Sequence, residues 1–249
     1  MDNLPEDIII IIYNKLCLSD IYNFNYINKR FYNIFKKNKT YITPILVDKY
    51  TDIDTFYNED YNLIYNKLYK LEYINELCFK NCDMNNINFL ENVEINYLNI
   101  YKCFNLSLLP QFKNLYKISI DDCASITNIS LDNDCLLNVR IINLTRCYKI
   151  TDISILSKNK KLYSLNISDC ININSDITKF DKLEKLNIAG CNKLDYSDNT
   201  IKYLNRIKFL IIDCIFEKEY KNKLNNYKVE HGGNISYYKK YCFSCNNRI

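Results

Sequence analysis

A nine-residue pattern recurs seven times along the middle of the chain. It reads aliphatic-x-x-aliphatic-x-apolar-x-x-Cys, and six copies keep strict register, with cysteines at 82, 103, 123, 147, 170 and 191. The seventh copy, over residues 207–215, has Cys214 one place early. Successive cysteines are 20 to 24 residues apart, which is the length of a solenoid repeat. One such unit cannot bury its own apolar face, so the pattern predicts a stack of coils that share one core.

The alternation within each copy predicts a short strand with one buried face. After each cysteine the chain must turn and return, as residues 150–156 do with a polar start and an apolar face. We therefore expect an α/β fold, a solenoid whose short parallel strands form a concave sheet. Residues between the aliphatic positions point outward, and they are either solvated strand residues or a surface that binds a protein or peptide. The candidates are Asn99, Tyr101, Lys102, Asp121, Asn143, Thr145, Arg146, Asn166, Ser168 and Asp169, with Tyr101, Lys102 and Arg146 as anchors.

The repeated cysteine is best explained as a packing residue. A small, mostly apolar side chain with a weak S–H donor suits the place where the chain bends beneath a strand. The alternative, a metal or redox stack, is not needed to explain the recurrence. The N-terminus is acidic and carries no export signal, so we expect reduced thiols in a cytoplasmic or nuclear setting.

The repeats resemble the cysteine-containing leucine-rich repeats of F-box proteins. Their pattern, L-x-x-L-x-L-x-x-C-x-x-I-T-D, matches best at residues 142–152, which read Ile-Asn-Leu-Thr-Arg-Cys-Tyr-Lys-Ile-Thr-Asp. The resemblance covers residues 71–215. It implies a leucine-rich-repeat solenoid that holds a target protein.

Residues 1–35 do not join the repeat and carry signals for three short helices. Pro5 suits a first helical turn, and Ile8, Ile12 and Leu16 form a helical apolar stripe. The order Leu-Pro-Glu-Asp-Ile-Ile, then Asp-Ile, then Lys-Arg-Phe resembles an F-box, with Phe31 where the family often has Trp and Asn28 where it often has Cys. The other interpretation is a generic helical cap for the solenoid. The resemblance implies that a Skp-type adaptor binds Leu4, Pro5, Ile8, Ile9, Ile12, Leu16, Ile27 and Phe31.

The remaining segments connect and close the solenoid. Residues 36–70 are expected to form a helical linker, with a helix start at Thr43-Pro44. Residues 216–249 are expected to form a C-terminal cap and tail, with a polar helix over 217–224 and a last strand at 227–229. The tail holds a lone Cys242-Phe-Ser-Cys245 motif, which we interpret as part of a frayed or packed tail; the alternative is a zinc or redox site.

Composition argues against several classes of function. Three glycines are too few for a phosphate-binding loop, and a single histidine, His231, leaves no triad. We therefore expect no enzyme activity, no cofactor and no metal. The net charge of +4 is spread among both signs, so we expect no nucleic acid as partner, and no apolar run is long enough for a membrane span. The heavy use of Asn, Ile, Lys and Tyr is similar to that of amoebal giant viruses and other AT-rich genomes, and a viral chain would act in the host cytoplasm.

Together these features predict the substrate receptor of a Skp–cullin–F-box-type ubiquitin ligase. Its F-box would dock the adaptor and its solenoid would recruit an unknown target protein. The alternative is a leucine-rich-repeat scaffold or decoy that recruits no ligase.

Overall fold

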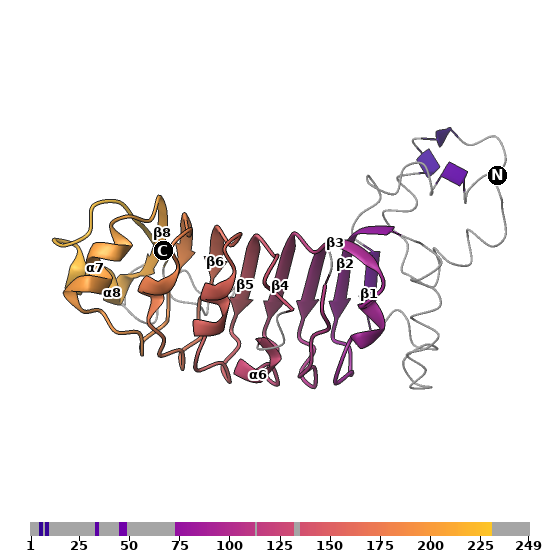
Figure 1. Cartoon of the computed structure of the whole chain (residues 1–249), viewed down its shortest axis with the longest axis horizontal. Helices are drawn as coiled ribbons and strands as arrows, with labels where there is room; N and C mark the ends of the chain where they lie inside the picture. Colours follow the sequence, from indigo (N-terminus) through magenta and orange to yellow (C-terminus); the bar gives the residue numbers. More distant parts are fainter. Residues whose placement is uncertain are drawn as a thin grey trace, which may run out of the picture.

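The computed structural model is a single row of parallel strands coiled into a solenoid (Figure 1). It describes residues 5–6, 8–9, 33–34, 45–48, 73–112, 114–131 and 135–230. The sheet has nine strands in sequence order, each pairing in parallel with the next. The strands are β1 (Ile45–Asp48), β2 (Tyr73–Lys80), β3 (Glu94–Tyr101), β4 (Lys117–Asp121), β5 (Ile141–Thr145), β6 (Ser164–Asn166), β7 (Lys185–Asn187), β8 (Phe209–Asp213) and β9 (Lys228–Glu230).

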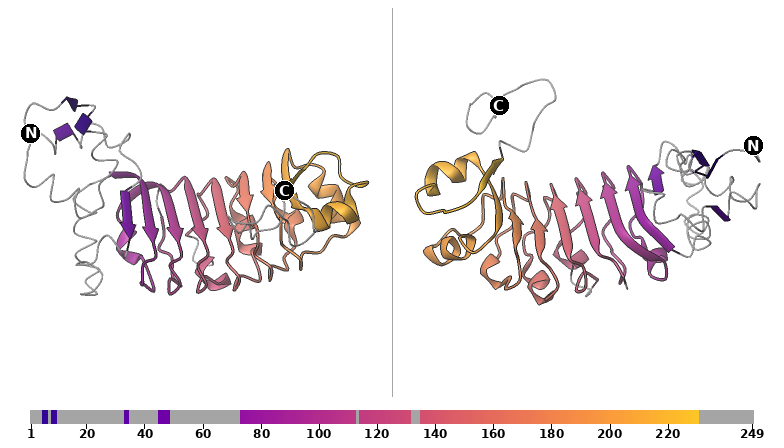
Figure 2. Two further views of the ribbon diagram at one scale, coloured as in Figure 1. Left: turned by 180° about the vertical axis from the view of Figure 1, so that it is seen from behind. Right: turned by 90° about the horizontal axis from the view of Figure 1, so that it is seen from above.

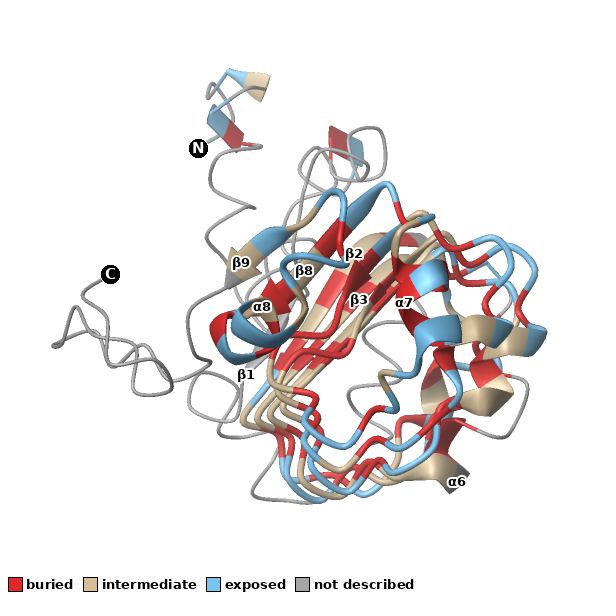
Figure 3. Ribbon diagram, turned by 90° about the vertical axis from the view of Figure 1, so that its left-hand side faces the viewer, coloured by how far each residue is buried: buried red, intermediate tan, exposed pale blue. Residues whose placement is uncertain are grey.

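Short helical segments form the opposite side of the coil from the sheet. Seen along the solenoid, the strands line one side while α6 and α7 lie on the other (Figure 3). Three of these segments are short 3-10 helices of three to five residues. The segments on that side are η1 (Asn88–Leu90), α6 (Asn128–Leu131), η2 (Ser154–Lys158), η3 (Ile177–Lys179) and α7 (Asp198–Leu204). A further helix, α8 (Cys214–Tyr220), follows β8 directly, contacts β8 and β9, and lies apart from α6 and α7 (Figure 3).

The aliphatic positions of the repeats form one continuous core, as the alternation predicts. In β3, Leu98 and Ile100 are buried while their neighbours are half-exposed. All seven repeat cysteines are buried and none forms a disulfide, so they are packing residues as expected. The return segment contributes as well, because Ile150 and Ile153 are fully buried. The solenoid fold predicted from the repeat is therefore confirmed.

Two predicted helices are wrong in part. Residues 45–48, expected to start a helix after Thr43-Pro44, form strand β1 and pair with β2. The edge of β2 presents unpaired backbone groups, which an extended neighbour satisfies and a helix does not. The polar helix expected over 217–224 is α8, which begins at Cys214 and buries Cys214 and Phe216. The sheet therefore runs past both ends of the 71–215 region, and β9 supplies the last strand that the sequence predicted.

Most of the expected three-helix module lies outside the described residues. Glu6, Ile8 and Ile9 are helical, and the backbone N–H of Ile9 donates to the Pro5 carbonyl at 3.2 Å. The rest of the helical linker, the Cys242-Cys245 motif and His231 also lie outside them. Within the part of the chain that is described, no helix has the length and apolar character required to cross a membrane.

Candidate protein-binding surface

The turn after each strand uses a left-handed residue directly before the repeat cysteine. Asn81, Lys102, Asp122, Arg146 and Asp169 have φ between 52° and 58°, and Gly190 takes the same place with φ 76°. Backbone N–H groups of the first five donate to a carbonyl of the following repeat; that of Asp122, for example, reaches the Thr145 carbonyl at 3.0 Å. The turn thus extends the hydrogen-bond ladder by one step and aims the outward side chains of successive repeats in the same direction.

The cysteine thiols link each repeat to the one before it. A thiol is a weak donor, and here it lies within reach of a buried backbone carbonyl on the preceding coil. Burial also raises the pKa of Cys191 to about 12, so this thiol stays protonated. The contacts are Cys123 to Ile100 at 3.9 Å, Cys147 to Ile120 at 3.7 Å, Cys170 to Leu144 at 2.7 Å and Cys191 to Ile167 at 2.9 Å.

The predicted target-binding residues form two registered rows on the outer face of the sheet and a third in the turns. In the first row, Ser119 on β4 is the strand partner of both Asn99 and Asn143. In the second row, Asp121 is the strand partner of both Tyr101 and Thr145. The turn row contains three of the left-handed residues. With one exception the predicted residues are half-exposed: Asn99, Tyr101, Lys102, Asp121, Asn143, Thr145, Arg146, Asn166 and Asp169.

The exception is Ser168, which is 7% exposed and does not join the outer row. The Asn166 side chain accepts a hydrogen bond from the Ser168 backbone N–H at 2.9 Å. This local turn competes with the strand, so β6 ends at Asn166 and Ser168 no longer alternates outward. Asn187 makes the equivalent contact to the Ala189 N–H at 3.0 Å, and β7 also ends after three residues.

Arg146 is engaged within the chain and is not the open anchor that the sequence predicted. Its Nη2 lies 2.7 Å from Asp121 Oδ1 and donates to Oδ2 at 2.7 Å. Burial raises the pKa of Asp121, although the Arg146 guanidinium opposes this shift. Nearby, the Lys102 ammonium lies over the Tyr101 ring at 5.2 Å. The downstream ends of β3 to β5 therefore form one connected polar cluster.

Sequence reasoning missed a second group at the upstream ends of the strands. Arg140 lies over the Tyr116 ring at 5.8 Å, and Lys185 lies 5.8 Å from the Tyr163 ring and 5.1 Å from the Phe209 ring. We call this group, which also includes Tyr97 and Lys117, the aromatic–basic strip. Its residues occupy the two variable places between the first and second aliphatic residues of each repeat. An enrichment of these places in aromatic and basic residues was visible in the sequence. In the second to the seventh repeat the pairs read Asn-Tyr, Tyr-Lys, Arg-Ile, Tyr-Ser, Glu-Lys and Lys-Phe.

Sequence reasoning also missed a row of apolar side chains that directly follow the repeat cysteines. Phe104, Tyr148, Ile171 and Ile215 each come directly after a repeat cysteine, and each is 40–50% exposed. They recur with the repeat period, so they form an interrupted apolar edge beside the downstream polar cluster. Lone exposed apolar residues are common, but their regular spacing marks this edge as part of the accessible surface.

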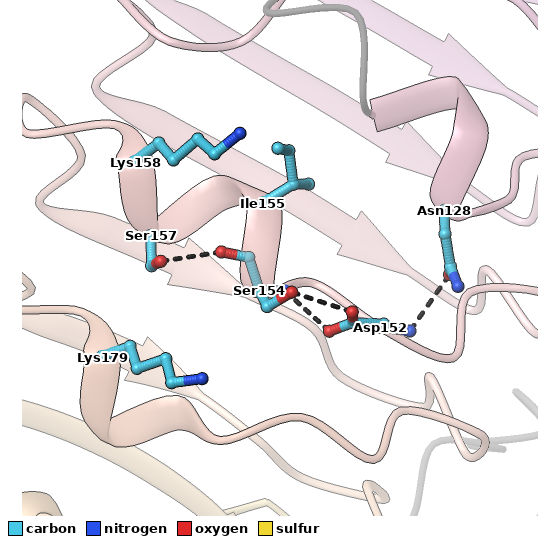
Figure 4. A pocket seen from close by; sticks show the side chains of 7 residues that line it. All are labelled: Asn128, Asp152, Ser154, Ile155, Ser157, Lys158 and Lys179. Atoms are coloured by element: carbon cyan, nitrogen blue, oxygen red, sulfur yellow. Dashed lines mark hydrogen bonds between the residues drawn. The ribbon is translucent and has the colours of Figure 1, made fainter.

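The loop side of the coil carries an open polar hollow (Figure 4). The Asn128 amide oxygen accepts from the backbone N–H of Asp152 at 3.0 Å, and Ser154 donates to the Asp152 carboxylate at 2.8 Å. Burial raises the pKa of Asp152, but hydrogen bonds from Ser154 and Ser175 outweigh it and the net pKa is lowered. These groups join consecutive coils, so the polar atoms of the hollow serve the fold.

Asp213 ends the ladder at the last full repeat. Its Oδ2 accepts from the Gly190 N–H at 2.9 Å, where earlier repeats use a backbone carbonyl. Its Oδ1 accepts from the N–H groups of Ile215 and Phe216, both at 2.8 Å, and so caps the N-terminus of α8. One carboxylate therefore closes the turn of the preceding repeat and caps the helix that begins at Cys214.

The predicted adaptor-binding residues are described only in part. Pro5 is exposed, Ile8 is 40% exposed and Ile9 is buried. The other members, Leu4, Ile12, Leu16, Ile27 and Phe31, lie outside the described residues. Within the described ranges, no group of three or more His, Cys, Asp or Glu side chains could hold a metal ion.

No protein-family model matches this chain, and no curated protein matches it either.

Proposed function

We propose that this chain binds a target protein on the outer face of its sheet and brings it to a ubiquitin ligase of the Skp–cullin–F-box type. The observation that carries the binding role is the registered outer surface of a nine-stranded parallel sheet, with half-exposed polar and aromatic side chains at every repeat. A stacked core holds these side chains in place before any partner arrives, which lowers the entropy lost on binding.

The ligase role rests on sequence alone, through the resemblance of residues 1–35 to an F-box and of residues 71–215 to cysteine-containing leucine-rich repeats. In this role the protein contributes proximity, because it raises the effective concentration of the target near the loaded ubiquitin. The exposed positions of Pro5 and Ile8 are compatible with a docking helix.

The test is copurification of the full chain with a Skp-type adaptor from eukaryotic cells. We expect recovery of the adaptor with the wild-type chain and its loss with the double variant Leu4→Ala/Pro5→Ala. Asn33→Ala is the matched control, because Asn33 is exposed and lies outside the F-box pattern. A wild-type chain that recovers no adaptor would favour the alternative, a leucine-rich-repeat scaffold or decoy.

Target binding is tested separately by proximity labelling with the full chain. Asn99→Ala/Asn143→Ala changes the middle of the outer face without touching the core. We expect this variant to lose the labelled target and to keep the adaptor. Loss of both would point to misfolding, and loss of neither would place the target elsewhere.

A further inference from the structure

From β4 to β8, the outer face of the sheet separates charge along the direction of its strands. At the upstream ends, the aromatic–basic strip carries the cations Lys117, Arg140 and Lys185. At the downstream ends, the carboxylates Asp121, Asp122, Asp169 and Asp213 occur in the last strand position or in the turn, and Arg146 in the same turns pairs with Asp121. This separation is a property of the fold, because the strands are parallel and every repeat presents the same end to the same edge.

Among the residues that the structure describes, no carboxylate neutralises the cations of the strip. No ion pair joins Lys117, Arg140 or Lys185 to a carboxylate among the described residues. Glu184 is next to Lys185 in sequence, but its carboxylate pairs with the Lys208 ammonium at 2.9 Å. Three positive charges therefore remain available to a ligand.

Aromatic rings lie against two of these cations, Arg140 and Lys185. Arg140 is beside Tyr116, and Lys185 is between Tyr163 and Phe209, which come from the neighbouring repeats. A hydrogen bond with Tyr116 raises the pKa of Tyr163, so the two tyrosines on either side of Arg140 are linked. Phe209 is 61% exposed, the highest value among the large hydrophobic side chains that the structure describes. The strip thus offers apolar contact area together with fixed positive charge, the combination that contributes most to binding energy at interfaces.

We propose that the aromatic–basic strip binds an acidic, extended peptide segment of the target protein, which runs across the strands from β4 to β8. This inference deepens the proposed target-binding role and rests on it. Lys117 and Lys185 share one register row three strands apart, which corresponds to about 14 Å at the usual strand spacing. An extended chain covers that distance in roughly four to five residues. Two or more carboxylates within such a segment reach Lys117, Arg140 and Lys185 at once.

Charge complementarity favours a peptide over a nucleic acid. A nucleic-acid backbone repeats its charge without interruption, and it needs a long positive groove. Here the positive strip is narrow, and the downstream carboxylates of the same face would repel any phosphate that leaves it. A short acidic peptide fits within the strip and avoids them.

The test measures binding of fluorescein-labelled octaglutamate to the full chain by fluorescence anisotropy, with labelled octaglutamine and octauridylate as comparison probes. We expect octaglutamate to bind more tightly than both, and its Kd to rise steeply with salt. The variant Arg140→Gln/Lys185→Gln should weaken octaglutamate binding about tenfold. The control Lys158→Gln/Lys179→Gln removes the same charge from η2 and η3 on the other side of the coil, and it should leave Kd unchanged.

Each contrary result overturns the proposal in a distinct way. Equal binding of octaglutamate and octaglutamine would show that the strip does not select acidic peptides. If the two double variants lost octaglutamate affinity equally, the net charge of the protein, and not the strip, would explain binding. Tighter binding of octauridylate than of octaglutamate would assign the surface to nucleic acid. Adaptor copurification tests residues 1–35 independently, so failure of the ligase role and failure of this peptide site are separate outcomes.

Discussion

The left-handed turn before each cysteine makes a quantitative prediction at Gly190. A Cβ added there would lie 2.5 Å from the Asp169 carboxylate Oδ1 and 3.2 Å from the Asp169 Cα. The carboxylate can rotate away, but the backbone of Asp169 is held by its N–H bond to the Ala189 carbonyl at 2.8 Å. A non-glycine residue with φ near 76° costs about 1 kcal/mol, and displacing the neighbour costs about 1 kcal/mol more. We therefore expect Gly190→Ala to lower the free energy of unfolding by about 2 kcal/mol.

The matched control is Asp122→Ala, which places the same residue at the equivalent turn of another repeat. Asp122 already carries a Cβ at φ 55°, so neither the backbone cost nor a new contact is added there. We expect Asp122→Ala to change stability by no more than about 0.5 kcal/mol. The pair separates the cost of adding a Cβ at Gly190 from the cost of placing alanine at this turn in general.

The assay is urea unfolding followed by far-ultraviolet circular dichroism. With an unchanged m value, Gly190→Ala should lower the urea midpoint by about 0.7–1 M. A midpoint equal to that of the wild type, or an equal loss in Asp122→Ala, would refute the argument that glycine is required at this turn. A changed m value would mean that the variant alters the surface exposed on unfolding or that the coil unfolds in more than one step.

Three further predictions follow from the buried and half-buried polar groups. Asn159→Ala should lower the free energy of unfolding, measured in urea, by about 2–3 kcal/mol. The buried Asn159 amide donates to the Leu136 and Val139 carbonyls at 2.7 and 2.6 Å, and the variant leaves both carbonyls without this donor. An unchanged free energy of unfolding would mean that water replaces the amide. Iodoacetamide should label the half-exposed Cys78 before the buried Cys191, whose raised pKa leaves little thiolate, as read by peptide mapping; equal rates would contradict the burial of the repeat thiols. Asp152→Asn should lower the thermal midpoint at pH 7, because the lowered pKa of Asp152 stabilises the fold fully above the unfolded-state pKa of 3.8. This difference between the variant and the wild type should shrink below pH 3.8 and disappear as pH falls through the folded-state pKa, and a difference that persists at about pH 2 would exclude the carboxylate as its source.

Much of the candidate surface was predictable because a strand has a period of two. Once Leu98 and Ile100 are assigned to the core, Asn99 and Tyr101 must point outward, and the same reasoning holds for each repeat. The failures came where a side chain competes with the backbone. Asn166 ends β6 with its own amide oxygen and turns Ser168 inward, and no alternation rule includes that contact.

Contacts between repeats account for the other differences. Arg146 and Asp121 are 25 residues apart in sequence and form an ion pair only because consecutive coils stack in register. Arg140 and Tyr116 meet in the same way, so the aromatic–basic strip exists on the surface and not in any single copy of the repeat.

The sequence by itself determined the coil, since a repeat of 20 to 24 residues with one cysteine and three aliphatic positions can bury its apolar face only by stacking. It also determined that the repeated aliphatic positions and the seven repeat cysteines are inside. Tertiary structure alone decided where the sheet ends: residues 45–48 became strand β1 because β2 offered an open hydrogen-bonding edge, which outweighed the local signal of Thr43-Pro44 for a helix. A local sequence pattern predicts the conformation of one segment. A strand edge, an ion pair or a cation between two rings needs two segments that are far apart in sequence, and only the folded chain brings them together.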